Sequence, residues 1–471
     1  MDKTKIMSRS RFLKLSATGF LGMLSLSACL KPNFDDEDNN QQMRVICLAD
    51  LHSSHRHFPR ILNFVSQLHQ QSGERQLILI NGDIFETSNK VASRSKGALE
   101  WYFLERLSKH AQVVVNLGNH EGGLENDFSR VVERMRRLDI AVVSNIRNKA
   151  DGSNLASTAI TVTQNNQLLR IIGLSCSNPD TYQPIHRNTW HFPEPSQYLN
   201  EKLGSLLHNG AVHIVMNHDG FIADNEVLDK MPAGSVVLGG HDHLRAHLQT
   251  DSWLALHTAW GGHLCDIIEM SPRDGTNPRS YKITTVEFDD HIGEDTEMGQ
   301  MIKTQEARHL NSTESATAGS FLQHTTPHAF ISNTVNWFRR AAGTDAAFIN
   351  NTTFGPVLPF GKVRFYDIDN TIRFDSSLFK AEVRGSQLKQ IIKRANQFSN
   401  HKWEERTGEF VVGAFPNTID PFKTYTIAVN DWVAKPGNQL AFLGIDGLSF
   451  EALPEELCMR NIVASRLSPS S

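Results

Sequence analysis

From residue 43 onward, short apolar runs alternate with longer stretches whose apolar residues recur at helical spacing. Residues 43–50 (MRVICLAD), 76–83 (QLILINGD) and 112–119 (QVVVNLGN) predict strands. Residues 58–70 and 98–110 predict the helices between them. This alternation predicts an α/β fold in which helices cover a sheet.

Further apolar runs continue the pattern toward residue 290. They predict strands at 167–176, 212–217, 235–239, 245–249, 254–257, 263–270 and 281–288, and a helix near 195–208. The last four runs are short and close together, which favours an antiparallel second half. We therefore expect one domain over residues 43–290.

A polar stretch over residues 291–326 marks the best domain boundary, and it carries a candidate helix at 298–309. The hydrophobic pattern returns over 327–464, with helices expected at 329–342 and 386–398. These residues predict a second, smaller α+β domain.

The first 29 residues read as an export signal. Basic residues precede an apolar stretch from Leu13 to Leu26, which is shorter than the about 20 residues of a spanning helix. Residues 26–29 (LSAC) resemble the lipobox of bacterial lipoproteins, in which Cys29 becomes lipidated. We expect a membrane-anchored lipoprotein of a bacterial envelope, or a soluble periplasmic protein if an ordinary signal peptidase cleaves the chain.

Residues 8–14 (SRSRFLK) resemble a twin-arginine signal except that Ser10 replaces the second arginine, so the twin-arginine and general export routes both stay open. The polar, acidic residues 30–42 predict a flexible linker. The four later cysteines have no CxxC spacing, and we expect them to be buried with at most one disulfide.

Composition narrows the class of protein. The 471 residues are 39% hydrophobic and carry a formal net charge of -4, which is typical of a soluble globular chain of two or three domains. No broad basic field is expected, so nucleic acid is not a predicted partner. The 21 histidines favour metal binding, because imidazole is a common ligand of transition metals.

Polar clusters follow five of the predicted strands. A single such cluster is usually turn chemistry, but five in order predict one metal site beyond the carboxyl ends of the strands. The clusters are Asp50-Leu51-His52, Gly82-Asp83, Gly118-Asn119-His120-Glu121, Asn217-His218-Asp219-Gly220 and Gly239-Gly240-His241-Asp242-His243.

The ligand types narrow the metal. Carboxylates, an amide oxygen and imidazoles without thiolate suit zinc, manganese, iron or cobalt. A central carboxylate can bridge two ions about 3.5–4 Å apart, the spacing used for displacement at phosphorus.

Taken together, the motifs DxH, GD, GNHE, H and GHxH resemble the calcineurin-like metallophosphoesterase superfamily over about residues 43–290. The resemblance implies a four-layer α/β/β/α sandwich and two divalent ions bridged by Asp83. It also implies that His120 faces the substrate and stabilises the phosphoryl oxygens or protonates the leaving oxygen. The implied ligands are Asp50, His52, Asp83 and His243 for one ion, and Asp83, Asn119, His218 and His241 for the other.

The C-terminal part is similar to the substrate domain of the 5′-nucleotidase/UDP-sugar hydrolase family, through residues 330–350, 383–388 (VRGSQL) and 424–442. Residues 350–355 (NNTTFG) lack the arginine with which that family grips its substrate, and Arg364, Arg373 and Arg384 are nearby replacements. The family also stacks the base between aromatic rings, for which Phe442 and either Phe410 or Phe415 are candidates. We take Arg364, Arg373 and Phe442 as the candidate substrate-binding residues.

The resulting hypothesis is an exported two-metal phosphoesterase that hydrolyses phosphate monoesters, with 5′-nucleotides first, by attack of a metal-activated water. The alternatives are a cyclic-nucleotide or nucleotide-sugar phosphodiesterase, and a surface binding protein that keeps the metal fold with weak catalysis. One departure concerns His120: the family commonly continues as GNHEFD, and Gly123 stands where the orienting aspartate belongs. Glu86 or Asp127 is expected to supply that carboxylate from another loop.

Overall fold

The computed structural model describes residues 43–250, 253–271, 280–398 and 401–469. The predicted export signal, the lipidation site at Cys29 and the linker over 30–42 lie outside the described residues. Among the helices that are described, none has both the length and the apolar content needed to cross a membrane.

The first predicted strands form a six-stranded sheet. The strands β1 to β4 run parallel, whereas β13 is antiparallel to β1 and β14 is antiparallel to β13. In spatial order the sheet is β14 (Tyr281–Glu287), β13 (Leu264–Met270), β1 (Met43–Ala49), β2 (Gln76–Asn81), β3 (Ala111–Asn116) and β4 (Ile140–Val143).

A second six-stranded sheet packs against the first. Its four central strands are parallel, and both edge strands are antiparallel to their neighbours. In spatial order it is β11 (Arg245–Gln249), β12 (Trp253–Thr258), β10 (Ser235–Gly239), β9 (Val212–Asn217), β7 (Gln167–Leu174) and β6 (Ala159–Gln164). The antiparallel second half expected from the sequence therefore forms only in part, because β12 pairs in parallel with β10 and the four strands are divided between two sheets.

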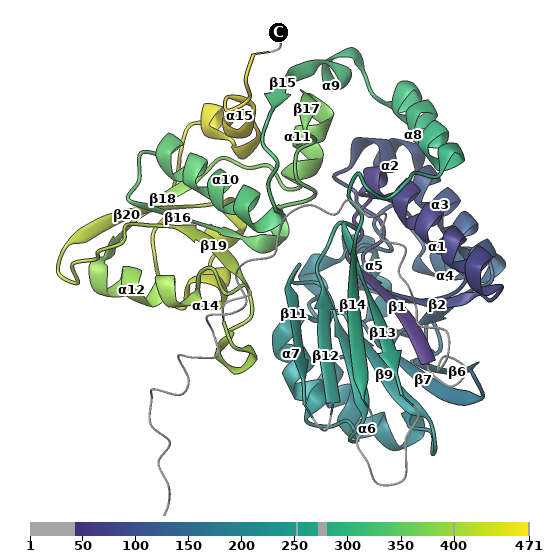
Figure 1. The fold of residues 1–471 in the computed structure, drawn as a ribbon. Coiled ribbons are helices and arrows are strands. Elements are labelled where there is room, and N and C mark those ends of the chain that lie inside the picture. The colour runs from purple at the N-terminus through teal and green to yellow at the C-terminus, as the bar shows by residue number, and fades with distance from the viewer. Residues whose placement is uncertain (1–42, 251–252, 272–279, 399–400, 470–471) are drawn as a thin grey trace, which may run out of the picture. The chain divides into compact units, whose positions relative to one another are not determined.

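The inner faces of the two sheets share one hydrophobic cluster, which includes Val45, Leu79, Ile171, Ile214 and Ile268. Helices cover both outer faces (Figure 1). Those on the first sheet are α1 (Phe58–Ser72), α3 (Ala98–His110) and α4 (Phe128–Arg137), and those on the second are α6 (Pro195–Leu206) and α7 (Gly220–Leu228). The predicted four-layer α/β/β/α sandwich is confirmed.

The stretch expected to join the domains is structured. It contains α8 (Thr296–His309), which packs on α2 (Lys90–Ser95) and α3, then the short α9 (Ser312–Ser315) and β15 (Thr317–Phe321).

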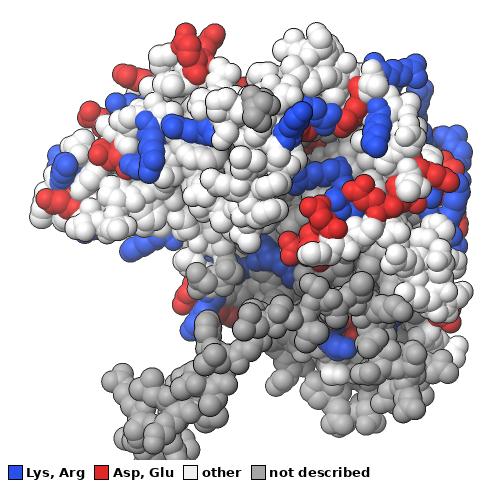
Figure 2. All heavy atoms as spheres, turned by 45° about the horizontal axis from the view of Figure 1, so that its top comes forward, with Lys and Arg blue, Asp and Glu red and all other residues white. Residues whose placement is uncertain are grey.

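On the face shown in Figure 2, Lys and Arg side chains are interspersed with Asp and Glu side chains.

The smaller domain contains a five-stranded mixed sheet, as the predicted α+β class requires. Its helix α10 begins two residues earlier than expected, because Thr326 caps it and Pro327 occupies the first turn. In spatial order the strands are β19 (Val411–Ala414), β16 (Ala346–Asn350), β20 (Thr424–Val429), β18 (Phe379–Arg384) and β21 (Glu451–Ala452), and the helices include α10 (Pro327–Ala341), α11 (Phe365–Thr371), α12 (Gly385–Arg394), α13 (Asp431–Ala434), α14 (Asn438–Leu443) and α15 (Met459–Ala464).

The remaining elements are short. They are β5 (Arg147–Asn148), α5 (Pro184–Thr189), β8 (Trp190–His191) and β17 (Gly361–Arg364), together with the 3-10 turns at 55–57, 179–181, 351–353, 403–405 and 455–457. The two domains belong to a single compact unit. All four cysteines within the described residues are free, and three of them are buried.

Candidate metal centre

The five polar clusters meet because the strands that precede them end at the same edge. A buried amide connects the two sheets there: Asn81, at the end of β2, donates from Nδ2 to the carbonyl oxygens of Asn217 (2.9 Å) and Leu238 (2.8 Å). Asn217 ends β9 and Leu238 lies near the end of β10. The clusters of both sheets therefore face one another.

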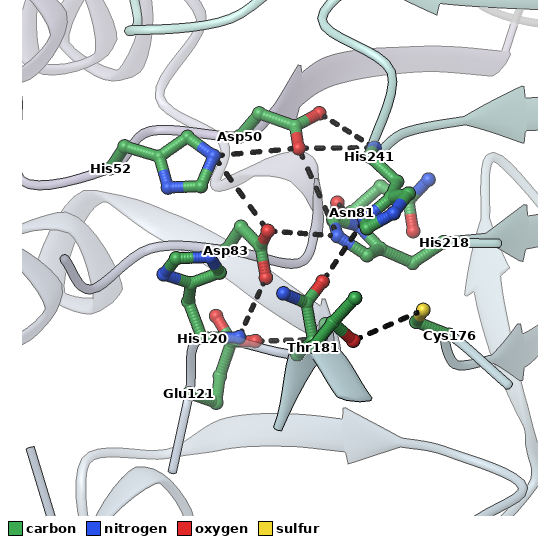
Figure 3. Close-up of polar contacts among 12 residues, drawn as sticks. Asp50, His52, Asn81, Asp83, His120, Glu121, Cys176, Thr181, His218 and His241 are labelled. Carbon is green, nitrogen blue, oxygen red and sulfur yellow. Dashed lines mark hydrogen bonds and ion pairs between the residues drawn. The ribbon is translucent and has the colours of Figure 1, made fainter. Parts of the chain in front are cut away.

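Asp83 lies at the centre of the resulting site (Figure 3). Its Oδ2 is 3.1 Å from His218 Nε2 and 3.7 Å from His52 Nε2. Asp50 Oδ1 is 3.7 Å from the same His52 nitrogen and 3.8 Å from the same His218 nitrogen. The backbone N–H of His120 donates to Asp83 Oδ1 at 2.9 Å. One carboxylate thus faces groups on both sides, as a bridging ligand would.

The structure brings all seven predicted ligands into this site. Three groups have ligand atoms that lie within 4.8 Å of one another: Asp50, His52 and His243; Asp83, His218 and His241; and His52, Asp83 and His120. Asn119 joins the second group, because its Oδ1 is 3.0 Å from His241 Nδ1. The third group means that distances alone do not separate His120 from the ligands, and the assignment of each role stays a prediction.

His218 shows that these side chains fit a cation. Its Nδ1 donates to the carbonyl oxygen of Asn81 at 2.7 Å, which leaves Nε2 as the nitrogen that faces Asp83. This Nε2 is buried and has no hydrogen-bond partner among the described residues. Burial alone would lower the pKa of His218, but Asp83 and Asp50 raise it to about 10. The carboxylates therefore favour a positive charge at this point, which a divalent cation supplies.

The backbone at the site is strained. Five predicted ligands are non-glycine residues with positive φ, an arrangement that costs about 1–3 kcal/mol per residue and persists only where surrounding contacts enforce it. They are Asp50 (50°), His52 (43°), Asp83 (56°), His241 (76°) and His243 (53°). Contacts within the fold therefore enforce the backbone conformation of these residues.

Glu121 has a role that sequence reasoning missed. Its carboxylate accepts hydrogen bonds from the backbone N–H of Ile84 (2.7 Å) and of Gly118 (2.6 Å). It thereby connects the loop that carries Asp83 to the loop that carries His120. Burial and the neighbouring Asp83 raise the pKa of Glu121 to about 7. The only signal in the sequence was its position directly after the GNH motif.

Of the two carboxylates considered for His120, Glu86 lies beside it. Glu86 Oε2 is 3.6 Å from His120 Nδ1, whereas Asp127 caps α4 by accepting from the N–H of Ser129 at 2.9 Å. A side chain at Gly123 would meet Thr87, whose Cγ2 lies 2.8 Å from the position of the added Cβ. The loop that contains Glu86 and Thr87 thus fills the space of the missing aspartate and supplies a carboxylate.

His120 itself is half-buried. Burial lowers its pKa, and this effect outweighs the opposing influence of Asp83 and Glu86. The imidazole is therefore not locked in its charged form by these carboxylates.

Arg373 brings a cation from the C-terminal domain into the metal centre. The side chain is buried, and its Nη2 lies 2.6 Å from Glu86 Oε2. The same guanidinium lies 3.0 Å from His52 Nδ1 and 3.1 Å from His243 Nε2. Burial would raise the pKa of Glu86, but Arg373 and His120 hold it well below its usual range.

Gly355, the last of residues 350–355, lies close to the segment that carries Arg373. A Cβ at Gly355 would lie 2.1 Å from the carbonyl oxygen of Asn370 and 3.2 Å from Arg373 Cγ. Only glycine allows the chain to approach this closely. A side chain at position 355 would therefore clash with the Asn370 carbonyl group and crowd the Arg373 side chain.

The other two predicted substrate residues have different surroundings. Arg364 is paired with Glu306 (2.7 Å) and with Asp367 (2.9 Å). Phe442 is 6% exposed and belongs to the hydrophobic cluster around β18 and α12, so the structure does not bring it to the metal ligands. Phe410 packs on Phe221 with 5.8 Å between the ring centroids. Each phenylalanine thus serves packing.

A cavity of about 290 Å³ adjoins the metal centre. His52, Glu86 and Arg373 line it on the metal side. A second cavity of about 560 Å³ lies next to it and shares Arg56, Glu306 and residues 356, 357 and 359 of its wall. The other polar lining residues of the first cavity include Asn89, Arg364, Tyr366, Asp367 and Asn370.

Comparison with known proteins gives two family matches. The calcineurin-like phosphoesterase family matches residues 43–245, and the family of 5′-nucleotidase C-terminal domains matches residues 297–414. An uncharacterized metallophosphoesterase of Bacillus subtilis, YunD, is 23% identical over 220 residues, which are 45% of each chain. The chain therefore aligns with less than half the length of that relative.

Two solved structures cover 90% of the chain. A 5′-nucleotidase precursor from Thermus thermophilus is 17% identical with a TM-score of 0.57, and 96% of it is covered. The sulfate thiohydrolase SoxB from Thermus thermophilus is 12% identical with a TM-score of 0.60, and 93% of it is covered. At these identities the similarity shows a shared two-domain fold.

Proposed function

We propose that the chain hydrolyses phosphate monoesters, with 5′-nucleotides as the first substrates to test, because residues 43–245 match the calcineurin-like phosphoesterase family and residues 297–414 match the 5′-nucleotidase C-terminal domains. The observation that carries the proposal is the convergence of seven predicted ligands, His120 and Arg373 at one point between the two domains. This set combines cation binding, proton transfer and anion binding.

The proposed ligands would hold two ions, with Asp83 as a ligand of each. Asp50, His52 and His243 complete one set, and Asn119, His218 and His241 complete the other. Their oxygen and nitrogen atoms suit manganese, zinc, iron or cobalt. When bound, such ions supply Lewis acidity toward the phosphoryl oxygens and lower the pKa of a water molecule toward neutrality.

The chain's own side chains perform the remaining tasks. We propose that His120 donates a proton to the leaving oxygen. Its Nδ1 faces Glu86, so Nε2 is the nitrogen that would face the substrate. We assign Arg373 to the phosphoryl oxygens as the buried cation beside the metal ligands; to bind them in the two-bond geometry of a guanidinium, it would exchange its present contacts with His52, His243 and the carbonyl oxygen of Thr352. Glu86 holds both side chains, since its Oε2 lies beside each of them.

The alcohol part of the substrate would occupy the cavity of about 290 Å³ beside Arg373. This volume is at the lower end of ligand pockets, which suits the polar sugar of a nucleotide. The adjoining cavity of about 560 Å³ favours a second candidate, a phosphodiesterase acting on nucleotide sugars or cyclic nucleotides, because it offers room for a larger group.

A substrate panel tests the proposal. The purified full-length protein would be assayed with manganese, zinc or cobalt against AMP, UMP, ribose 5-phosphate, UDP-glucose, 2′,3′-cyclic AMP and bis-p-nitrophenyl phosphate. We expect the monoesters to be hydrolysed faster than the diesters. Faster hydrolysis of the diesters would favour the second candidate, and bound metal without turnover of any ester would favour a binding protein.

We also propose that the chain is exported and anchored through Cys29. The apolar stretch and lipobox of residues 13–29 support this. Expression in a bacterium with labelled palmitate should give a labelled, membrane-associated protein, and Cys29→Ala should remove both the label and the membrane association. An unlabelled protein released from the periplasm would instead indicate an ordinary signal peptidase.

A further inference from the structure

The C-terminal domain contacts the loop that carries two of the proposed metal ligands. Asn351, which follows β16 and is 1% exposed, donates from Nδ2 to the carbonyl oxygens of Asp242 (3.2 Å) and His243 (2.7 Å). We propose that Asn351 is a positioning residue that holds the 241–243 loop in its ligand geometry. The C-terminal domain is then a structural part of the metal centre as well as a wall of the substrate cavity. This inference rests on the proposed metal site.

The loop needs such support because its backbone is strained. His241 and His243 have φ angles of 76° and 53°, which residues other than glycine rarely adopt. The catalytic domain secures the first part of the loop: the N–H of His241 donates to Asp50 Oδ1 at 3.0 Å, and Asp242 Oδ2 accepts from the N–H of Phe221 at 2.7 Å. The bonds from Asn351 secure the carbonyl groups that follow.

A second contact, from residues 351–355 through Trp260, supports His243. The ring of Trp260 stacks on the His243 imidazole, with 5.6 Å between centroids and 9° between planes. Trp260 Nε1 donates to the carbonyl oxygen of Gly355 at 3.3 Å. Residues 351–355 of the C-terminal domain therefore contact both the loop and the ring that covers its last ligand.

Asn351 is itself held in place. Its backbone N–H donates to the carbonyl oxygen of Phe410 at 2.9 Å. Phe410 and Trp403 pack in the hydrophobic cluster around Phe221 of α7, and Trp403 Nε1 donates to Asn225 Oδ1 at 2.6 Å. The amide that supports the loop thus stands on a segment anchored to the catalytic domain.

Metal binding tests this role without relying on catalysis. We would measure ions bound per chain and the affinity for Mn²⁺ in the full-length protein and in Asn351→Asp and Asn351→Ala. The first variant keeps the shape but places a carboxylate against two carbonyl oxygens, and the second removes the donor. We expect the ion that His243 would hold to bind about 10–100-fold more weakly in both variants, because the Asn351 bonds reach the carbonyl oxygens of Asp242 and His243; this is the usual effect of losing a group that orients ligands.

Asp369→Asn is the matched control. It weakens the ion pair between Asp369 and Lys90 (2.5 Å), which joins the same two domains, but leaves the Asn351 contacts in place, so both ions should bind as in the wild type. Thermal unfolding would confirm that each variant folds. If Asn351→Asp does not fold, Asn351→Ala alone provides the test.

Three outcomes decide the inference. Wild-type affinity for both ions in the folded Asn351 variants would overturn it, and the proposed function would stand. Equal loss of an ion in Asp369→Asn would also overturn it, because the effect would then come from domain docking in general. Selective weakening of the ion that His243 would hold supports the inference. It does so even if no ester of the panel is hydrolysed, because missing hydrolysis would count against the proposed function alone.

Discussion

The carboxylate of Glu86 and the guanidinium of Arg373 form a buried ion pair across 287 residues of sequence, with Oε2 and Nη2 2.6 Å apart. The same carboxylate oxygen lies 3.4 Å from His52 Nδ1 and 3.6 Å from His120 Nδ1. One residue of the catalytic domain therefore contacts a proposed ligand, the proposed catalytic imidazole and the proposed phosphate-binding arginine. Removing one member of such a pair leaves the other as an uncompensated buried charge.

Replacing Glu86 should impair catalysis through both of its partners. We expect Glu86→Gln to lower kcat about 10–100-fold, because His120 and Arg373 lose the group that orients them. Steady-state kinetics on the best monoester would measure this. The control is Asp127→Asn, which changes the carboxylate that caps α4 and should leave kcat unchanged. Equal losses in the two variants would contradict the assignment of Glu86.

Arg373 should determine the binding of the phosphoryl group. Arg373→Lys keeps the charge but loses the planar pair of donors, so we expect KM to rise about tenfold and inhibition by inorganic phosphate to weaken similarly. Arg364→Lys is the comparison, because Arg364 lines the same cavity while its charge is balanced by Glu306 and Asp367. A larger effect at position 364 would place the substrate arginine there instead.

Substitutions of His120 and of Asp83 should distinguish proton transfer from metal binding. We expect His120→Ala to reduce kcat about 10²–10⁴-fold while the ion content stays unchanged. Asp83→Asn should reduce the ion content itself, because the carboxylate faces both ligand groups. Metal analysis of both purified variants checks this directly. Loss of an ion in His120→Ala would make His120 a ligand, as the grouping of His52, Asp83 and His120 allows.

Glu314 should make stability depend on pH. Its carboxylate is bound by Arg94 and also contacts Lys90, and the Arg94 hydrogen bonds lower its pKa to about 2, from an ordinary value of 4.5. Because the folded pKa is the lower one, the stabilisation is present above pH 4.5 and is lost as the pH falls toward 2.

Glu314→Gln should therefore lower the free energy of unfolding by about 1–2 kcal/mol at pH 6, a value reduced for screening because Arg94 is 41% exposed. The difference from the wild type should shrink as the pH falls from 4.5 to 2. Thermal unfolding across this range measures it, with Glu105→Gln, from an exposed pair with Lys109, as a control expected to change little. A difference that is constant with pH would contradict the ion pairing.

Most of the catalytic domain could be predicted from the sequence, because its signals are local. The strands that end at Ala49, Asn81 and Asn116 are apolar runs followed by polar turn residues. Such a pattern predicts both that a strand is buried and where it ends. Parallel strands place their carboxyl ends at one edge, so the meeting of Asp50 and Asp83 followed from the pattern. The partition of the later strands between two sheets did not, because pairing partners are chosen by packing.

The sequence by itself thus determined the fold class, the residues that meet at the metal centre and the chemistry they suit. The tertiary structure decided which of two carboxylates faces His120, which of three arginines enters the site, and that Asn351 supports the 241–243 loop. These relationships join residues 34, 287 and 108 positions apart, and a hydrogen bond or ion pair depends on side-chain positions that only the packed domains define. Gly123 illustrates the difference: its departure from the family pattern was visible in the sequence, but the Thr87 methyl group that fills the space was visible only in the fold.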